Sequence, residues 1–597
     1  MKIGIEIHQR LDCKKLFCRC DSNPVNNKSP DIILKRKLHP VLSELGETDL
    51  ISKKEAEKQN EFLYQYFNSS NCLVEADEEP PNPINPNALK IACEISMQLE
   101  CFFFDEIHTM RKIVIDGSNT SGFQRTAMVS FGGKLKTSRG IVRITSIALE
   151  EESAGIVEKS KGVSTYKLDR LGIPLVEITT EPHIVDEKHL KETAQLIGNI
   201  LRATGKVARG IGTIRQDVNI SIEKGERIEI KGAQDLSILN TLVQNENKRQ
   251  LGLIQISNEL KRRFKSEKIS FDFEMFDLTF VFGNTSSKII SKGLSNNEGV
   301  FGIKLPNYSG ILGIEIQNGK RYGTELSDYA KQSGVKGIIH SDEDLSKYQF
   351  SKEEIESINK KLKTGKNDAF VLVVSKKETA FLALRNVYER SLILGVLKET
   401  RKANPDGTTS YLRPISGGAR MYPETDIPPI VLDTHFFDSV KKEMSVSFDE
   451  QKKYLESILN KEMAQIILKS KNLSLFEKFV SKGYEPMLVA ITLENIITSV
   501  RRQGIDFLDL EDVLDAIFSG YKNEKIAKSA IEPILIEFAK GSTFAKILKE
   551  KKLGRIKGKK LEKISKELNY DIKEIMKKYR LNIEPDDVVK LIKNHKN

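Results

Sequence analysis

The local pattern of the sequence changes along the chain and then returns, which constrains the domain organisation more than any single motif. Residues 1–285 carry short β-branched runs, helical stretches and glycine-punctuated turns, a pattern typical of a mixed α and β domain. Residues 286–402 have the texture of a compact α+β domain, and residues 403–439 resume the loop-rich, proline-rich style of the first part. Such a return indicates an insertion into a surface loop, which folds tolerate well.

The C-terminal part of the sequence is almost purely helical. Apolar residues recur at helical spacing in short segments that polar or glycine-containing links separate. This pattern predicts a helical domain over 440–540 and a second helical tail domain over 541–597. We therefore expect a multidomain α+β chain with a mixed sheet, an inserted α+β domain and all-α domains at the C-terminal end.

Positive charge is concentrated in the last tenth of the chain. The whole chain has 94 Lys and Arg against 83 Asp and Glu, a formal net charge of +11. Residues 541–597 alone hold 17 basic and 8 acidic residues. A basic terminus is typical of proteins that bind a polyanion such as nucleic acid, and a solvated lysine-rich helix face has the same composition.

Composition excludes several other classes of protein. Hydrophobic residues make up 39% of the chain, which is enough to bury cores and excludes disorder as the main state. The sequence has no apolar stretch of about 18 residues and no apolar leader segment, so we expect no membrane association. Six cysteines are too few for a disulfide scaffold and fit a reducing cytoplasm, where we expect the protein to reside.

Carboxylates gather at three strand-like segments. The run GIEIH alternates strictly, so Glu6 and His8 point to the same face of a strand. The run LEEESAG supplies Glu150 and Glu151, and LVEITTEP supplies Glu177. Singly, each is more often a salt-bridged or solvated residue. Together they suit Mg²⁺ held by protein oxygens and phosphates, or acid–base chemistry.

The sequence contains two further polar clusters, of which the first suits phosphate groups. The glycine-rich run IDGSNTSG is not a Walker loop, but it offers backbone N–H donors and small polar side chains. These side chains are Ser118, Asn119, Thr120 and Ser121. The run RQDVN has the spacing of a strand, which places Arg215, Asp217 and Asn219 on one face.

Three cysteines lie close together in the sequence. Cys13, Cys18 and Cys20 can begin a zinc site, which needs a fourth ligand, and Cys72 and His39 are the possible ones. The alternative interpretation is free thiols near a turn. The sequence has no GxSxG motif and no Ser–His–Asp pattern, so serine hydrolase chemistry has no support.

Long runs of the sequence match one known family. They include GIEIHQRLDCKKLFCRC, IDGSNTSGFQRTAMVSFGG, IALEEESAG, YKLDRLGIPLVEITTEPHI and MYPETDIPPI. In these runs the chain closely resembles the GatB/GatE family, and within it the E subunit of the archaeal glutamyl-tRNA(Gln) amidotransferases. The resemblance covers essentially the whole chain. Residues 286–402 resemble the insertion domain of bacterial-type aspartyl-tRNA synthetases, and residues 541–597 resemble the helical GatB/YqeY-type tRNA-binding domain.

The resemblance implies a tRNA-dependent ligase with glutamine as the amido donor. ATP and Mg²⁺ would serve to phosphorylate the side-chain carboxylate of glutamate mischarged onto tRNA(Gln), and ammonia from a separate amidase, the D subunit of the same enzyme, would displace the phosphate. It implies catalytic roles for Glu6, His8, Glu150, Glu151 and Glu177. Of these, His8, Glu151 and Glu177 would bind the metal.

The resemblance also assigns the remaining motifs. ATP would contact the Ser118–Ser121 loop and the RQDVN strand. The bacterial branch has a four-cysteine zinc site that begins at the match to KLFCRC, and the missing second CxxC pair puts zinc in doubt here. Phosphates of tRNA would contact basic residues of the tail: Lys551, Lys552, Arg555, Lys557, Lys559 and Lys560.

Two other functions fit parts of the sequence. A non-catalytic tRNA-binding scaffold subunit would share the basic tail, but it would be free to lose Glu6, His8 and the LEEE run, which are all present. A carboxylate–amine ligase for a free small molecule would share the carboxylates, but it would need neither the inserted domain nor the tail.

Overall fold

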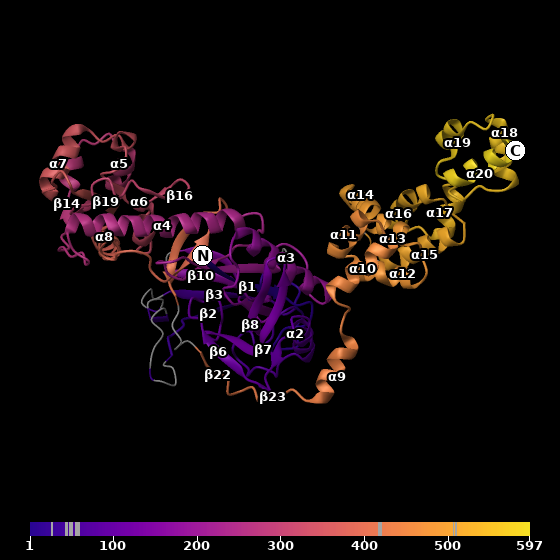
Figure 1. The fold of residues 1–597 in the computed structure, drawn as a ribbon, viewed down its shortest axis with the longest axis horizontal. Coiled ribbons are helices and arrows are strands. Elements are labelled where there is room, and N and C mark those ends of the chain that lie inside the picture. Colours follow the sequence, from indigo (N-terminus) through magenta and orange to yellow (C-terminus); the bar gives the residue numbers. More distant parts are fainter. Residues whose placement is uncertain are drawn as a thin grey trace. The chain divides into compact units, whose positions relative to one another are not determined.

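The chain forms two compact units. The computed structural model describes residues 1–25, 28–41, 46, 52–53, 56, 60–160, 162–415, 421–505, 507 and 510–596. The first unit comprises Met1–Gly198 with Lys206–Met444, and the second comprises Asn199–Gly205 with Ser445–Asn597 (Figure 1). The division at Met444 lies next to the boundary predicted at residue 440.

The first unit is built around an 11-stranded mixed sheet. The strand order is β21-β20-β13-β12-β1-β11-β8-β7-β6-β22, with β4 paired beside β7. Neighbours are antiparallel except for the parallel pair β13 and β20. The strands are β1 (Lys2–Arg10), β4 (Phe102–Phe103), β6 (Thr109–Ile113), β7 (Phe123–Thr137), β8 (Gly140–Glu151), β11 (Pro174–Thr180), β12 (Ile214–Ser221), β13 (Ile228–Lys231), β20 (Glu399–Ala403), β21 (Thr409–Pro414) and β22 (Met421–Pro423).

The central strand β1 shows why the sheet has one polar face. Ile3, Ile5 and Ile7 are fully buried, whereas Glu6 and His8 alternate with them on the opposite face. Helix α2 (Pro86–Gln98) packs against β7 and β8. Its first turn is stabilised because Asn85 accepts a hydrogen bond from the N–H of Asn87 at 2.9 Å and proline occupies the first helical position. Helix α3 spans Glu187–Ala203.

A second, four-stranded sheet carries a small aromatic core. Its order is β2-β3-β10-β9, and Phe62, Tyr64 and Tyr166 are buried on it. The strands are β2 (Ile32–Arg36), β3 (Glu61–Tyr66), β9 (Gly155–Ser160) and β10 (Val163–Lys167). Shorter elements of the first unit are β5 (Glu106–Ile107), β23 (Ile430–Val431), β16 (Glu315–Gln317), β17 (Lys320–Arg321) and α9 (Thr434–Glu443).

The segment predicted as an insertion contains its own sheet with both faces covered. The strand order is β14-β15-β19-β18. Along β15, Phe301 and Ile303 enter one core and Val300 enters the other, as the alternation of a strand requires. The elements are β14 (Phe276–Asp277), β15 (Gly299–Leu305), β18 (Ile339–His340), β19 (Ala369–Ser375), α4 (Leu239–Phe264), α5 (Lys288–Ser295), α6 (Tyr322–Lys331), α7 (Lys352–Leu362) and α8 (Lys377–Leu392).

The ends of this segment differ from the predicted bounds of 286–402. Leu253, Ile256 and Leu260 of α4 already belong to its core, so its packing begins before residue 286. At the other end, β20 begins at Glu399 and pairs with β13 in the large sheet. The periodicity of the sequence did not reveal either end, because helix α4 and strand β20 each pack both with this segment and with the neighbouring part of the fold.

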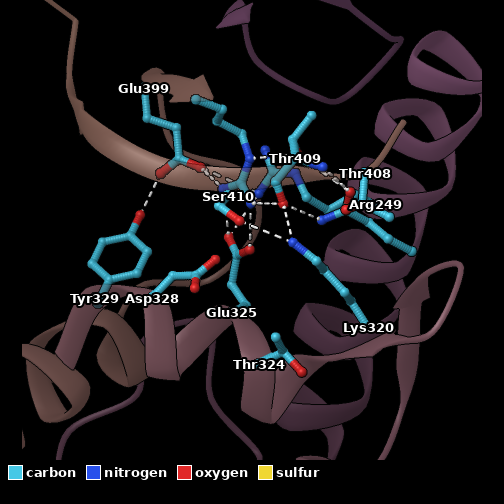
Figure 2. Close-up of polar contacts among 12 residues, drawn as sticks. Arg249, Lys320, Thr324, Glu325, Asp328, Tyr329, Glu399, Thr408, Thr409 and Ser410 are labelled. Carbon is cyan, nitrogen blue, oxygen red and sulfur yellow. Dashed lines mark hydrogen bonds and ion pairs between the residues drawn. The ribbon is translucent and has the colours of Figure 1, made fainter. Parts of the chain in front are cut away.

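A buried ion-pair network joins α4, α6 and β20 (Figure 2). Arg249 Nη1 lies 2.7 Å from Glu325 Oε1, and Arg401 Nη2 lies 3.0 Å from Glu325 Oε2. Arg401 also pairs with Glu399, and Tyr329 donates its hydroxyl to the same carboxylate. These charged side chains are almost fully buried. Their opposite charges therefore compensate one another for the loss of hydration.

The second unit is helical, which confirms the helical pattern predicted near the C-terminal end. Its elements are α10 (Phe448–Ile458), α11 (Lys461–Lys469), α12 (Leu473–Ser481), α13 (Pro486–Ile491), the π-helical turn η5 (Thr492–Ile496), α14 (Ile497–Arg502), α15 (Leu510–Lys522), α16 (Ile531–Ala539), α17 (Phe544–Glu550), α18 (Lys559–Glu567), α19 (Ile572–Tyr579) and α20 (Pro585–Lys596). Helices α18–α20 have a small core of their own around Ile575. Ile547 and Leu553, which lie beyond residue 540, pack instead in the larger core. Within the described residues, no helix is both long and apolar enough to cross a bilayer.

Candidate functional site

The polar face of the large sheet brings together most of the predicted catalytic residues. In the strand register, His8 of β1 lies opposite Glu177 of β11 on one side and opposite Arg215 of β12 on the other. Glu6 lies opposite Asp217 of β12. Because β1 is a central strand, residues from three neighbouring strands share this face.

His8, Glu150 and Glu177 form the first cluster. His8 Nε2 lies 3.4 Å from Glu177 Oε2 and 3.9 Å from Glu150 Oε2. Lys112 Nζ donates a hydrogen bond to Glu150 Oε1 at 3.0 Å. One ligand atom from each of His8, Glu150 and Glu177 lies within 4.8 Å of the others. Two carboxylates and an imidazole at this spacing fit a divalent cation with coordination positions left for phosphate or water.

The electrostatics of the cluster favour the binding of a cation. Burial and the neighbouring Glu177 raise the pKa of Glu150. Burial opposes ionisation of Glu177 as well, but the hydrogen bond and charge of His8 hold the pKa of Glu177 below its usual range. Burial would lower the pKa of His8, but its hydrogen bond to Glu177 and the nearby negative charges raise it. Two carboxylates this close are stabilised by a positive partner, which a bound cation can supply.

Glu151 does not join this cluster. The predicted metal set paired His8 and Glu177 with Glu151, but adjacent residues of a strand point to opposite faces, and the carboxylate beside His8 and Glu177 is that of Glu150. Glu151 accepts a hydrogen bond from the backbone N–H of Arg125 at 2.9 Å and lies 3.4 Å from its guanidinium. Burial raises the pKa of Glu151.

Glu424 completes the arrangement around Glu151, and no local sequence pattern indicates it. It accepts hydrogen bonds from Arg125 at 2.8 Å and from Arg111 at 2.5 Å, and it is 3% exposed. Glu424 directly follows β22, within residues 403–439. A contact between residues about 300 positions apart leaves no signal in the local pattern.

A second acidic cluster lies on the same face and already contains a cation. Glu6, Asp217 and Glu229 lie within 4.8 Å of one another. Lys231 Nζ lies 2.8 Å from Asp217 and 2.5 Å from Glu229, and these carboxylates raise the pKa of Lys231 against the effect of burial. The side-chain amide of Asn219 donates to Glu6 at 2.9 Å. Glu229 and Lys231 come from β13 and were not among the predicted site residues.

Three arginines converge on Glu152, which directly follows Glu151. Arg10 donates to Glu152 Oε1 at 2.8 Å, Arg170 pairs with the same oxygen, and Arg215 Nη2 lies 3.9 Å away. Glu152 is 1% exposed, whereas Arg170 and Arg215 remain about one-third exposed. One carboxylate cannot neutralise three guanidinium groups, so a net positive region borders the His8 cluster. Arg10 lies two residues beyond His8 in the same alternation, so the strand pattern contained a signal for it.

The predicted phosphate loop is largely occupied by its own contacts. Asp116 accepts from the N–H of Ser118 at 3.0 Å, Asn119 Oδ1 accepts from Ser153 at 3.1 Å, and Thr120 donates to the carbonyl of Glu75 at 2.7 Å. Asn119, Thr120 and Ser121 line a small cavity with Arg125 and Glu151 rather than the His8 cluster. Asn119 is 1% exposed, and its Nδ2 has no hydrogen-bond partner in the described part of the chain.

Three thiols and one carboxylate form a separate group near the N-terminal end. The side chains of Cys18, Cys20, Cys72 and Glu75 offer ligand atoms within 4.8 Å of one another, and Cys13 is not among them. Cys72 was a possible fourth ligand in the sequence, as was His39, which does not belong to this group. Hydrogen bonds from Cys18 and Cys72 lower the pKa of the Cys20 thiol to about 4. Three thiols and a carboxylate fit the tetrahedral ligand set of zinc.

The predicted tRNA-binding residues of the tail divide into two groups. Lys551 lies 3.4 Å from Glu537, Arg555 lies 2.7 Å from Asp587, and Lys557 pairs with Glu524. Within the described residues, Lys552, Lys559 and Lys560 form no ion pair, and all three are exposed. The second group is therefore the better placed to contact an external anion.

Comparison with known proteins gives one consistent result. The family model "GatB/GatE catalytic domain" matches residues 1–438. The E subunit of glutamyl-tRNA(Gln) amidotransferase from Methanocaldococcus jannaschii is 44% identical over 578 residues, which cover 94% of this chain and 90% of that protein. The proteins of the same name from Sulfolobus acidocaldarius and Thermococcus sibiricus are 44% identical over 552 residues and 42% identical over 580 residues. These alignments cover 90% and 95% of this chain and 86% and 90% of the two relatives.

Proposed function

The chain belongs to the GatB/GatE family, and from this premise we propose that it is the tRNA-binding and transamidating subunit of a glutamyl-tRNA(Gln) amidotransferase. It binds Glu-tRNA(Gln), phosphorylates the glutamyl side-chain carboxylate with ATP, and converts it to the amide with ammonia. The ammonia comes from glutamine through a partner amidase, the D subunit of the same amidotransferase. The chain is thus a carbon–nitrogen ligase of cytoplasmic protein synthesis.

The observation that carries this proposal is the pairing of two oppositely charged regions on one face of the sheet. The His8, Glu150 and Glu177 cluster suits a cation, and the three arginines around Glu152 suit phosphate oxygens. Arg10 shares the alternation of His8 along β1, and Arg215 lies opposite His8 in the strand register, so the two regions are neighbours. A nucleoside triphosphate with its divalent cation has the complementary charge pattern.

The chemistry needs such a site because a carboxylate is a poor electrophile. An oxygen of the glutamyl carboxylate attacks the γ-phosphorus of ATP, the new O–P bond forms, and the bond to ADP breaks. Ammonia then attacks the carbonyl carbon, the C–N bond forms, and inorganic phosphate leaves with the C–O bond electrons. Mg²⁺ at His8, Glu150 and Glu177 would neutralise charge on the transferring phosphoryl group.

The chain's own residues bind phosphate oxygens, position one another and transfer a proton. Arg10, Arg170 and Arg215 bind phosphate oxygens, and Glu152 orients the three guanidinium groups. Lys112 holds Glu150 in place. Burial and the neighbouring Glu177 raise the pKa of Glu6. We therefore propose that the Glu6 carboxylate accepts the proton that ammonia loses when it attacks.

Other predicted residues take supporting roles in this proposal. Asp217 and Asn219 hold Lys231 and Glu6 in position. Glu151 of β8 and Glu424 both pair with Arg125 of β7, so Arg125 connects the two carboxylates. Residues of the Ser118–Ser121 loop line the small cavity beside Arg125 and Glu151. Zinc bound by Cys18, Cys20, Cys72 and Glu75 would fix the segment that follows β1. Exposed tail lysines, among them Lys559 and Lys560, contact tRNA phosphates.

The test is ATP-dependent conversion of Glu-tRNA(Gln) to Gln-tRNA(Gln) by this chain alone, with ammonium chloride as the nitrogen donor. Conversion supports the assignment of both activation and amidation to this chain. Failure that the amidase partner rescues would mean that the partner completes the site. Failure with the partner present, while tRNA still binds, would favour the non-catalytic scaffold.

A further inference from the structure

A fully exposed isoleucine lies beside the phosphate-binding arginines, and the proposed function has not used it. Ile211 is 105% exposed, whereas the next most exposed large apolar side chain in the described part of the chain, Phe280, is 67% exposed. The Ile211 side chain therefore packs against none of the described residues, and its whole apolar area is available to a ligand.

Two glycines hold Ile211 at the tip of a short loop, residues 209–213. Gly210 has a φ of 127° and Gly212 has a φ of 82°, and the space around both is open. Residues with a Cβ rarely adopt such conformations. Thr213 closes the loop, because its hydroxyl donates a hydrogen bond to the carbonyl of Gly210 at 2.9 Å. The N–H groups of Ile211 and Gly212 bond to no described residue, so the tip presents an apolar side chain together with two N–H donors.

The base of the 209–213 loop is fixed to a strand residue that faces phosphate in the proposed function. The N–H of Arg10 donates to the carbonyl of Thr213 at 2.9 Å, and the N–H of Ala208 donates to the carbonyl of Arg10 at 2.9 Å. The side-chain amide of Gln9 donates to the carbonyls of Ala208 at 2.9 Å and Thr213 at 3.2 Å. The loop therefore begins and ends at the backbone of Arg10.

This anchoring limits how far the tip can lie from the arginines around Glu152. Two residues of extended chain span at most about 7 Å, so the Cα of Ile211 lies within that distance of the Cα of Thr213. On the other side of Thr213, the chain enters β12, which carries Arg215. Ile211 thus lies at the edge of the region to which the proposed function assigns phosphate oxygens.

The residues assigned so far account only for the charged end of a nucleotide. The His8, Glu150 and Glu177 cluster suits the cation, and the three arginines suit the phosphates. The base at the other end is flat and has apolar faces, and its removal from water onto an aliphatic side chain is favourable. An exposed isoleucine beside the phosphate region can provide that surface.

We infer that the 209–213 loop recognises the base of ATP, with the side chain of Ile211 lying against one face of the purine ring. The N–H groups of Ile211 and Gly212 are placed to donate to oxygens of the ribose or of the adjacent phosphate. Ile211 touches no reacting atom and contributes affinity for the nucleoside part of the substrate. This inference rests on the proposed function, since it names a further contact of the same nucleotide.

The test compares ATP with inorganic triphosphate, each with Mg²⁺, by calorimetric titration of the full chain. We expect Ile211→Ser to bind ATP about tenfold more weakly, because a buried aliphatic contact is lost. Its affinity for triphosphate, which has no base, should equal that of the wild type. Ile211→Leu retains the apolar area and should bind ATP as the wild type does.

The matched control is Ile141→Ser. Ile141 is 54% exposed near the start of β8, at the opposite end of that strand from Glu150, and the variant should bind both ligands as the wild type does. In the amidation assay, Ile211→Ser should raise the KM for ATP and leave kcat and the KM for Glu-tRNA(Gln) unchanged. Both serine variants should keep the thermal midpoint of the wild type, because the side chains changed are exposed.

The outcomes separate this inference from the proposed function. A wild type that binds neither ATP nor triphosphate would count against the proposed function itself. If the wild type binds both, equal losses of ATP and triphosphate affinity in Ile211→Ser would overturn the base contact, as would wild-type affinity for ATP. The inference is also overturned if Ile211→Ser keeps its ATP affinity but loses affinity for tRNA or for the amidase partner, since the loop is then a contact for a macromolecule.

Discussion

At the scale of single residues, the contrast between Glu150 and Glu151 is the sharpest consequence of the structure. The two are adjacent in β8 but lie on opposite faces of the sheet, one beside His8 and the other beside Arg125. We expect Glu150→Gln to lower ATP-dependent phosphorylation of Glu-tRNA by about 100-fold or more, because it removes a carboxylate from the cation cluster. Single-turnover assays with radiolabelled ATP measure this, and tRNA affinity should remain that of the wild type.

Glu151→Gln is the matched comparison for that prediction. It leaves Arg125 with one buried carboxylate partner fewer, and breaking a buried pair costs on the order of 3 kcal/mol. The main effect should therefore be a lower midpoint of thermal unfolding. If Glu151→Gln abolishes phosphorylation while its thermal midpoint is unchanged, the assignment of the two residues must be exchanged.

The thiol group gives a prediction about metal content. If Cys18, Cys20, Cys72 and Glu75 hold zinc, the purified chain contains about one zinc ion and Cys72→Ser loses it. Metal analysis by mass spectrometry gives the stoichiometry, and a strong chelator should lower the thermal midpoint of the wild type but not that of Cys72→Ser. Cys93→Ser is the control, since Cys93 is buried in α2 away from this group. Equal zinc content in all three proteins would rule the site out.

At the scale of elements, the buried ion-pair network connects helices α4 and α6 to strand β20 of the large sheet (Figure 2). Burial opposes ionisation of Glu325, but Arg401 and Arg249 hold the pKa of Glu325 at about 2, against 4.5 for an ordinary glutamate. A depressed folded-state pKa stabilises the fold above the unfolded pKa, so this contribution disappears as the pH falls from about 4.5 towards 2. We expect Glu325→Gln to lower the free energy of unfolding by about 3 kcal/mol at pH 7 and by less near pH 3.

Urea unfolding monitored by circular dichroism between pH 7 and pH 3 provides the measurement. Glu267→Gln is the control, because Glu267 is 84% exposed in its pair with Lys261 and an exposed pair contributes little. A difference between Glu325→Gln and wild type that does not depend on pH would contradict the role given to this carboxylate.

At the scale of the whole molecule, the core contacts decide where the basic tail can be removed. Ile547 and Leu553 belong to the larger helical core, so a chain that ends at residue 540 loses core residues as well as charge. A chain that ends at Lys557 removes α18–α20 with their own core and keeps the larger one. We expect this truncation to weaken tRNA binding and to reduce the salt slope by about 2. An unchanged slope, measured by filter binding over a range of salt, would remove the tail from the tRNA-binding surface.

Local sequence patterns determined many of the helices and strands of this protein and the direction of the side chains on them. The alternation of GIEIH predicted that Glu6 and His8 share a strand face, and β1 has that arrangement because its isoleucines are buried on the other side. The helical periodicity beyond residue 440 predicted the helices of the second unit. Such patterns are readable because side-chain direction repeats every two residues in a strand and every 3.6 in a helix.

Only the tertiary structure decided which residues meet. The periodicity of β8 made Glu150 and Glu151 opposite in direction, but the pairing of β8 with β11 decided that Glu150 faces His8. Glu424 reaches Arg125, and Glu75 joins the three thiols, through contacts between segments that are distant in the chain. Sequence periodicity fixes which way each side chain points on its own element, whereas the partners on the other side depend on strand register and packing between distant segments.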